Sequence, residues 1–147
     1  MPFYEFPRPA VTADVVLFAG APEDLRVLLI RRGREPYAGS WALPGGFLDE
    51  DEPICDAARR ELAEETGIEW TGPLVEVGAF GDPGRDPRGW TVSVAWVAHV
   101  GLEPLPVKAG DDAESAEWHR IADSPPLAFD HDEVVARALK AIGDAVS

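Results

Sequence analysis

Cysteine is almost absent from this sequence, which has a single one, Cys55, among 147 residues. One cysteine excludes an internal disulfide and a cysteine-rich zinc site. Long hydrophobic runs are also missing, because no apolar stretch approaches the ~20 residues of a membrane span. The opening MPFYEFPRPA lacks the positive segment and the apolar segment of a secretory signal. We therefore expect a cytoplasmic protein that does not associate with a membrane.

Positive charge is scarce as well, with 13 lysine and arginine residues against 27 acidic ones and a net charge of −14. Nucleic-acid binding depends on clustered basic residues, so this balance argues against a nucleic-acid partner. An acidic protein also repels a phosphate-bearing ligand unless a divalent cation lies between them. Alternatively, the excess acid only keeps the protein soluble. Composition alone favours the second interpretation.

The length of the chain fits one domain, residues 1–147, and its first ten residues contain three prolines and form an extended lead-in. Strands around two helices predict a mixed α/β or α+β domain with a helix on each face of a sheet. The expected strands are residues 11–20, 26–32, 41–43, 74–80, 90–100 and 116–120, and the expected helices are 53–66 and 130–142.

The first expected helix carries three glutamates, Glu61, Glu64 and Glu65, whose i, i+3, i+4 spacing makes their side chains converge. On a helical projection they share or border the apolar stripe that contains Leu62. A solvated charged face would lie on the opposite side of the helix. Carboxylates crowded on a packed face are unfavourable unless a cation joins them. The pattern therefore indicates a divalent-ion site with oxygen ligands.

Arg60 lies within this group of acids and has two interpretations. It can orient a carboxylate of the cluster, and Glu52, just before the helix, is close enough in sequence to reach it. Alternatively, Arg60 is a surface residue that pairs with Glu64 at i+4. The spacing alone does not choose between them.

These residues match the box of the Nudix hydrolase family, and the chain resembles that family over most of its length. Seven fixed and two aliphatic positions should coincide by chance less than about once in a million such chains. No position departs from the pattern. The positions are Gly46, Glu52, Arg60, Glu61, Leu62, Glu64, Glu65, Gly67 and Ile68.

The Nudix resemblance implies an α/β/α sandwich with a mixed β-sheet between helices. It also implies Mg²⁺-dependent hydrolysis, with Mn²⁺ as a substitute, of a nucleoside diphosphate linked to another group. By this resemblance the metal ligands are Glu61, Glu64, Glu65 and the backbone carbonyl of Gly45. Arg60 then orients Glu61, and one carboxylate, with Glu61 and Glu64 among the candidates, accepts the proton of the attacking water.

The loop after the box resembles that of the ADP-ribose pyrophosphatase subgroup, in which a proline follows the box at about the distance of Pro83. Arg85 and Arg88 in this loop can donate to phosphate or ribose oxygens, and Trp90 can stack on a base. The alternative is a stiff hairpin loop with solvated arginines.

Further candidates lie outside the box and the loop. Asp112 and Glu114 are similar in position to a downstream catalytic carboxylate of the subgroup, although a solvated acidic loop explains them as well. Arg31 and Arg32 end a strand and either contact phosphate or are surface charge. The segment 129–131, Phe-Asp-His, resembles one that lies near the nucleotide in the subgroup, and a helix N-cap is its plainer role.

Taken together, the residues and the resemblance predict hydrolysis of ADP-ribose to AMP and ribose 5-phosphate. One alternative is a Nudix hydrolase of another nucleotide, such as an oxidised nucleoside triphosphate or an NADH-type dinucleotide. Another is a sensor that binds ADP-ribose without cleaving it, in which a winged-helix domain would follow. The chain ends soon after Ile142 and its box is intact, which favours catalysis. The resemblance also implies a homodimer, as is common in the subgroup.

Overall fold

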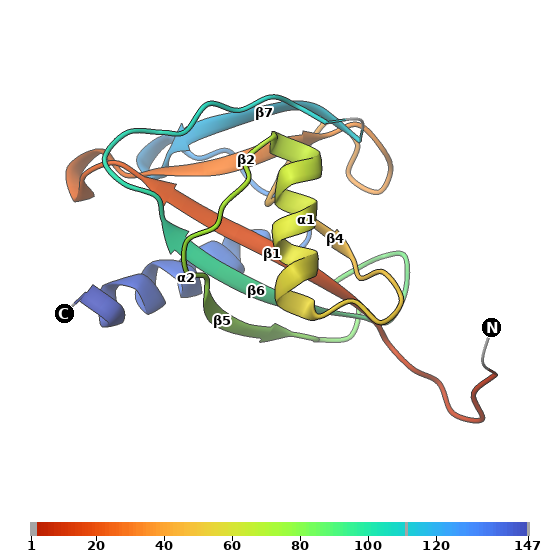
Figure 1. Ribbon diagram of the computed structural model, residues 1–147. Helices are drawn as coiled ribbons and strands as arrows, with labels where there is room; N and C mark the ends of the chain where they lie inside the picture. The colour runs from red at the N-terminus through yellow and green to blue at the C-terminus, as the bar shows by residue number, and fades with distance from the viewer. Residues whose placement is uncertain (1–2, 111, 147) are drawn as a thin grey trace.

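The fold was analysed in a computed structural model that describes residues 3–110 and 112–146. A mixed seven-stranded sheet lies between two helices (Figure 1), which confirms the expected α/β/α sandwich. The strands are β1 (Ala10–Ala19), β2 (Arg26–Arg32), β3 (Trp41–Ala42), β4 (Gly45–Phe47), β5 (Val75–Phe80), β6 (Thr91–His99) and β7 (Ala113–Arg120). The helices are α1 (Ile54–Thr66) and α2 (His131–Val146), with short 3-10 turns at Pro22–Asp24 and Ile121–Asp123.

The sheet is organised around β1, which is its central strand. Neighbouring strands follow the order β3-β2-β1-β6-β5, while β4 pairs with β1 and β7 pairs with β2. Strands β1 and β6 are parallel, from Ala10 opposite Thr91 to Phe18 opposite His99, and the other pairings are antiparallel. A strand with partners on both sides and a helix over each face is buried along most of its length, here from Thr12 to Ala19, which explains the apolar run that predicted it.

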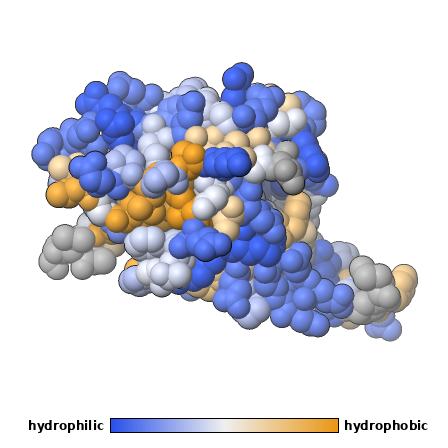
Figure 2. Space-filling view, turned by 45° about the horizontal axis from the view of Figure 1, so that its top comes forward, coloured by the Kyte–Doolittle hydropathy of each residue, from blue (hydrophilic) through white to orange (hydrophobic). Residues whose placement is uncertain are grey.

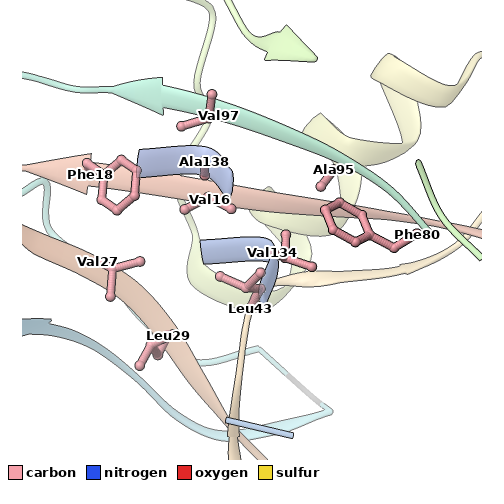
Figure 3. Close-up of a cluster of buried hydrophobic side chains, with 10 residues drawn as sticks. All are labelled: Val16, Phe18, Val27, Leu29, Leu43, Phe80, Ala95, Val97, Val134 and Ala138. Atoms are coloured by element: carbon pink, nitrogen blue, oxygen red, sulfur yellow. The ribbon is translucent and has the colours of Figure 1, made fainter. Parts of the chain in front are cut away.

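Alternation of side chains along β1 supplies two separate cores, because successive residues of a strand point to opposite faces of the sheet. Val15 and Leu17 belong to the cluster under α1. Val16 and Phe18 belong to the cluster under α2, which Figure 3 shows in close-up. All four side chains are fully buried. One strand therefore holds both helices in place.

Each helix contributes its own apolar residues to the cluster that it covers. Leu62 of α1 is fully buried in the first cluster. Val134 and Ala138 of α2 are fully buried in the second, where they lie near Leu43. Helix α1 ends at Gly67, whose left-handed backbone (φ 76°) and N–H bond to the Ala63 carbonyl close the last turn.

Strand β4 was not expected from the sequence, which predicted no strand between residues 43 and 74. It pairs with β1, with Ala13 opposite Gly46 and Asp14 opposite Gly45. Glycine has low strand propensity, and two in succession conceal the strand. Their lack of a side chain is nevertheless required, since a Cβ at Gly46 would lie 2.6 Å from the Glu61 carboxylate and one at Gly45 would overlap Asp14. Strand β4 can therefore pass closely between β1 and α1.

The described residues contain no helix that is both long enough and apolar enough to span a bilayer. Figure 2 shows one face of the molecule, on which hydrophilic residues surround a smaller hydrophobic area. This distribution agrees with the acidic composition, because most charged side chains remain at the surface.

Truncating Leu62 tests the docking of α1. Leu62→Ala should lower the free energy of unfolding by ~2–5 kcal/mol, since it removes a fully buried side chain and leaves a cavity. Leu102→Ala is the control, because Leu102 is 70% exposed and such a change should cost less than ~0.5 kcal/mol. Urea denaturation measures both. Equal losses in the two variants would show that Leu62 does not anchor the helix.

Candidate active site

The three glutamates of α1 do not share one environment. Glu65 is 8% exposed, and its Oε1 accepts a hydrogen bond from the Gly45 amide at 2.9 Å. Glu61 lies beside Gly46, and its side chain is 14% exposed. The side chain of Glu64 is 57% exposed. The structure therefore turns Glu61 and Glu65 towards strand β4 and leaves Glu64 at the rim.

Burial makes the two inner carboxylates electrostatically unfavourable when ionised. Burial, together with the nearby carboxylates of Glu61 and Asp14, raises the pKa of Glu65 to about 8, although the hydrogen bond from the Gly45 amide opposes the shift. Burial also raises the pKa of Glu61, against the opposing effect of Arg60. Without a metal ion, the positive groups around Glu61 and Glu65 are therefore too few to balance the negative charge of the two carboxylates.

Arg60 connects the cluster through four hydrogen-bond partners, and it fits both interpretations drawn from the sequence. Its Nε donates to Glu52 at 2.8 Å, and its Nη1 donates to Glu61 at 2.8 Å and to Glu64 at 3.1 Å. Its Nη2 donates to the carbonyl of Phe47 in β4. Hydrogen bonds from Arg60 lower the pKa of Glu52. The guanidinium group therefore holds the start of the helix, the glutamates and β4 in one arrangement.

The donor set of this cluster suits a hard divalent cation, because its ligands are carboxylate and backbone oxygens. The raised pKa values of Glu61 and Glu65 are a cost that a bound cation would remove. Within residues 3–110 and 112–146, no three acidic, histidine or cysteine side chains are already arranged to hold an ion. Glu64 is instead hydrogen-bonded to Arg60. The chain thus brings two carboxylates together and keeps a third within the same cluster.

Asp112 and Glu114, the two downstream candidates, are placed differently. A hollow of about 330 Å³ is lined by the three glutamates, Gly110 and Asp112. Glu114 lies elsewhere, with a carboxylate oxygen 3.6 Å from Arg31 Nε. The acidic loop is docked on the end of α1 by the Gly110 amide, which donates to the Glu65 carbonyl. Asp112 is therefore the downstream carboxylate that faces the glutamates, and it is ion-paired with Arg34 at 2.7 Å.

Arginines face the glutamates across a second hollow of about 380 Å³. Its lining includes Arg32, Arg34 and Arg88 together with Glu61 and Glu65. Burial, with a contribution from Arg88, lowers the pKa of Arg32. An arginine remains charged even so. A ligand in this hollow would have acidic groups on one side and guanidinium groups on the other.

The loop between β5 and β6 contributes two of its predicted residues to a neighbouring hollow, whose lining includes Arg85, Arg88 and Phe129. Arg85 donates to both carboxylate oxygens of Asp130, at 2.8 and 2.6 Å, and its side chain is 5% exposed. Arg88 pairs with Asp86 and lies over Phe129, 5.4 Å from the ring centre. Arg85 is thus engaged within the protein, whereas Arg88 keeps a side chain that is 39% exposed.

Two predicted substrate contacts lie outside these hollows. Arg31 donates to the Gly39 carbonyl and lies near Glu114. Trp90 is 53% exposed just before β6. Neither is in the lining of the three hollows described above.

Sequence reasoning missed a buried polar group beneath the site. Asp14 is 5% exposed, accepts a hydrogen bond from the Ser93 hydroxyl, and lies 3.6 Å from His131 Nε2. A carboxylate in the apolar run 11–20 was a usable signal, because a buried charge needs partners. Ser93 had no such signal, and His131 was a candidate only as part of the segment 129–131. Their nearness to Asp14 depends on the pairing of distant segments.

Replacing Glu65 by glutamine should stabilise the metal-free protein at high pH. The pKa of Glu65 in the folded protein is about 8, against an ordinary 4.5. The carboxyl group therefore favours folding fully below pH 4.5, and that contribution is lost as the pH rises through 8. Glutamine carries no charge to desolvate and keeps an oxygen for the Gly45 amide. We expect the free energy of unfolding to rise by at least ~1 kcal/mol near pH 9 and little near pH 4.

Urea denaturation in a chelating buffer at the two pH values measures this effect. The matched control is Glu69→Gln, which removes the charge of an exposed glutamate just beyond the same helix and should change little at either pH. A gain that is equal at both pH values, or as large in the control, would contradict the assigned cause.

Comparison with known proteins agrees with the fold and the box. The family model of the NUDIX domain matches residues 8–138. An ADP-ribose pyrophosphatase from Methanocaldococcus jannaschii is 40% identical over 131 residues, which are 87% of this chain and 72% of that protein. The ADPR responsive transcriptional repressor NtrR of Acinetobacter baylyi is 35% identical over 91% of this chain, which spans about half (54%) of the repressor.

A solved structure extends the comparison to three dimensions. The NUDIX domain of Shewanella oneidensis NrtR, in a complex with ADP ribose, is 33% identical and has a TM-score of 0.85, over 93% of this chain and 90% of that one. The family model covers most of the sequence, and every position of the catalytic box is filled. The chain therefore belongs to the Nudix family of pyrophosphohydrolases.

Proposed function

We propose that this enzyme hydrolyses the pyrophosphate bond of ADP-ribose to AMP and ribose 5-phosphate, with Mg²⁺ as cofactor and Mn²⁺ as a substitute. The observation that carries the proposal is the hollow in which Glu61 and Glu65 face Arg32 and Arg88. The similarity to an ADP-ribose pyrophosphatase and to an ADP-ribose-bound NUDIX domain supports this choice of substrate.

Nudix hydrolases generally use divalent metal ions. We assign the ligands here to Glu61, Glu65, Glu64 and the Gly45 carbonyl, whose oxygen atoms suit such ions. When bound, the ion neutralises charge on the phosphate oxygens and lowers the pKa of the attacking water. Arg60 orients Glu61 through its 2.8 Å hydrogen bond. Glu64 would exchange its contact with Arg60 for the ion.

The proton of the attacking water needs an acceptor within hydrogen-bond reach. The candidates Glu61, Glu64 and Asp112 all line the acidic hollow, and we favour Glu64 and Asp112 because their side chains are much more exposed than that of Glu61. Glu114 is a weaker candidate, because its carboxylate lies beside Arg31. Asp112 is also ion-paired with Arg34 at 2.7 Å, a contact that holds its carboxylate at the edge of this hollow.

The arginines account for the substrate preference. Arg32 and Arg88 line the same hollow as the glutamates and can donate planar pairs of hydrogen bonds to phosphate or ribose oxygens. Arg85 acts indirectly, because Asp130 engages its guanidinium group. A substrate that spans from the glutamates to this wall must carry oxygen-rich groups on both sides of the cleaved bond, as ADP-ribose does.

A second candidate function is binding of ADP-ribose without cleavage, and the Acinetobacter repressor is the relative that favours it. The complete box distinguishes the two functions in favour of hydrolysis, since binding alone needs neither the paired inner glutamates nor Arg60. A ligand that binds and is recovered intact in the presence of Mg²⁺ would identify a sensor.

An assay of product release from a panel of nucleotides tests the proposal. We expect Mg²⁺-dependent release of AMP from ADP-ribose, a higher kcat/KM than for an oxidised nucleoside triphosphate or NADH, and no activity with chelator. Glu61→Gln should lower kcat at least ~10²-fold, because it removes a metal ligand. Glu69→Gln is the control and should keep full turnover. A wild type that prefers triphosphates would overturn the substrate while leaving the family unaffected, and unchanged turnover in Glu61→Gln would overturn the metal site.

Arg88→Ala tests the proposed substrate contact. It should lower kcat/KM for ADP-ribose by a factor that corresponds to ~1.5–3 kcal/mol of lost transition-state stabilisation, the range for a hydrogen bond to a charged group. The effect on a triphosphate should be smaller. Arg26→Ala, at an exposed ion pair with Asp24, is the control. Because Arg88 is the ion-pair partner of the buried Asp86, a thermal unfolding measurement checks that the variant is still folded. Equal losses for both substrates would show that Arg88 does not select ADP-ribose.

A further inference from the structure

The mechanism above gives the tripeptide Phe129-Asp130-His131, at the start of α2, no role beyond the contact of Asp130 with Arg85. Each of its side chains nevertheless holds a different part of the site. The Phe129 ring lies 5.1 Å from the guanidinium carbon of Arg32. Asp130 accepts two hydrogen bonds from Arg85. His131 is 4% exposed and reaches Leu43, 88 positions away in the sequence. The contact made by His131 reaches the backbone just before β4, two residues from Gly45.

His131 holds the first of three consecutive residues that enter β4. The Leu43 amide donates to His131 Nδ1 at 3.0 Å. The Pro44 carbonyl accepts from the amide of Val15 in β1 at 2.9 Å. The Gly45 amide then donates to Glu65, as described above. Helix α2, strand β1 and helix α1 thus each hold one residue of this turn.

The hydrogen bond to Leu43 determines the state of the imidazole ring. Because the Leu43 amide is the donor, Nδ1 carries no hydrogen, and the ring hydrogen of the neutral form lies on Nε2. Nε2 faces Asp14, 3.6 Å from its carboxylate. Both polar atoms of this buried ring are therefore directed at specific groups. Removal of the acceptor would leave a buried N–H unpaired, which is costly.

The backbone before His131 is strained, which indicates that the turn is held by its surroundings. Phe129 has φ 55°, a left-handed conformation that is unusual for a bulky residue. Such strain persists only where neighbouring contacts impose it, and it concentrates at functional sites. Here the contacts are the rings of Tyr37 and His131 and the guanidinium groups of Arg32 and Arg88.

The turn is closely packed against β1 and is bonded to one of the glutamates. A Cβ at Gly45 would overlap Asp14, so the backbone there lies directly against β1. Figure 3 shows Leu43 near Val134 of α2, in the cluster to which both belong. Because Leu43 is only two residues from Gly45, a displacement of Leu43 would also displace Gly45 and its hydrogen bond to Glu65.

We propose that His131 is a positioning residue of the hydrolytic site: its Nδ1 atom fixes the Leu43–Gly45 turn and thereby sets the backbone of Gly45 against Glu65. Groups that orient metal ligands from behind typically affect metal affinity or activity 10–100-fold. The role depends on the proposed function only for its kinetic readout, because metal affinity can be measured without substrate.

Two substitutions separate the hydrogen bond from the packing of the ring. His131→Asn places a side-chain oxygen near the position of Nδ1 and can still accept from Leu43, whereas His131→Leu has no acceptor. In His131→Leu we expect at least 10-fold weaker Mn²⁺ affinity by calorimetry, at least 10-fold lower kcat with little change in KM, and faster hydrogen exchange of the Leu43 amide. His131→Asn should stay within about threefold of wild type in the first two measurements.

Leu139→Ala is the matched control, because Leu139 packs against the same core about two turns further along α2. It should lower the melting temperature without weakening Mn²⁺ binding. The proposal is overturned if His131→Asn is as impaired as His131→Leu, or if the control loses Mn²⁺ affinity to the same degree. If His131→Leu does not fold, His131→Gln replaces it, since its longer side chain moves the polar atoms away from Leu43. A wild type that binds Mn²⁺ but cleaves no nucleotide would reject the proposed function and leave the affinity comparison valid.

Discussion

The crowding of carboxylates on the buried side of α1 is the constraint on which the rest of this structure depends. Glu61 and Glu65 point towards the sheet rather than towards water, and Asp14 approaches Glu65 from below. No packing of apolar groups can relieve this repulsion, because a buried charge needs an opposite charge or strong donors. The protein supplies Arg60 and the Gly45 amide, and leaves the remainder to a cation. The buried carboxylates thus lower the stability of the metal-free fold at the place where the chemistry requires negative charge.

The glycines of β4 make this arrangement sterically feasible. A strand with side chains could not pass between Asp14 and Glu61, so backbone takes the space that side chains would otherwise fill. The close approach brings main-chain donors and acceptors to the carboxylates. The glycines that make β4 hard to predict from the sequence are therefore the residues that the site requires.

Sequence reasoning was most successful where one segment determines its own structure. Helix α1 and the convergence of its glutamates follow from periodicity, and the strand at 26–32 has its predicted bounds. It failed where two distant segments determine the structure together. Strand β4 exists only through pairing with β1, and the partners of Asp14 come from residues 93 and 131. The placement of Asp112 rather than Glu114 beside the glutamates likewise follows from the docking of the loop on α1.

The parallel pairing of β1 with β6 has a consequence for the order of events during folding. The bonds that complete the site join residues 79 and 88 positions apart, Asp14 with Ser93 and Leu43 with His131. Such contacts require closure of long loops, which costs chain entropy. That cost is compensated only when the N-terminal and C-terminal halves of the chain have docked together. Helix α1 can form early from local interactions, but its carboxylates acquire their buried environment only at the end. A polypeptide halted midway would carry the complete box and still lack the site.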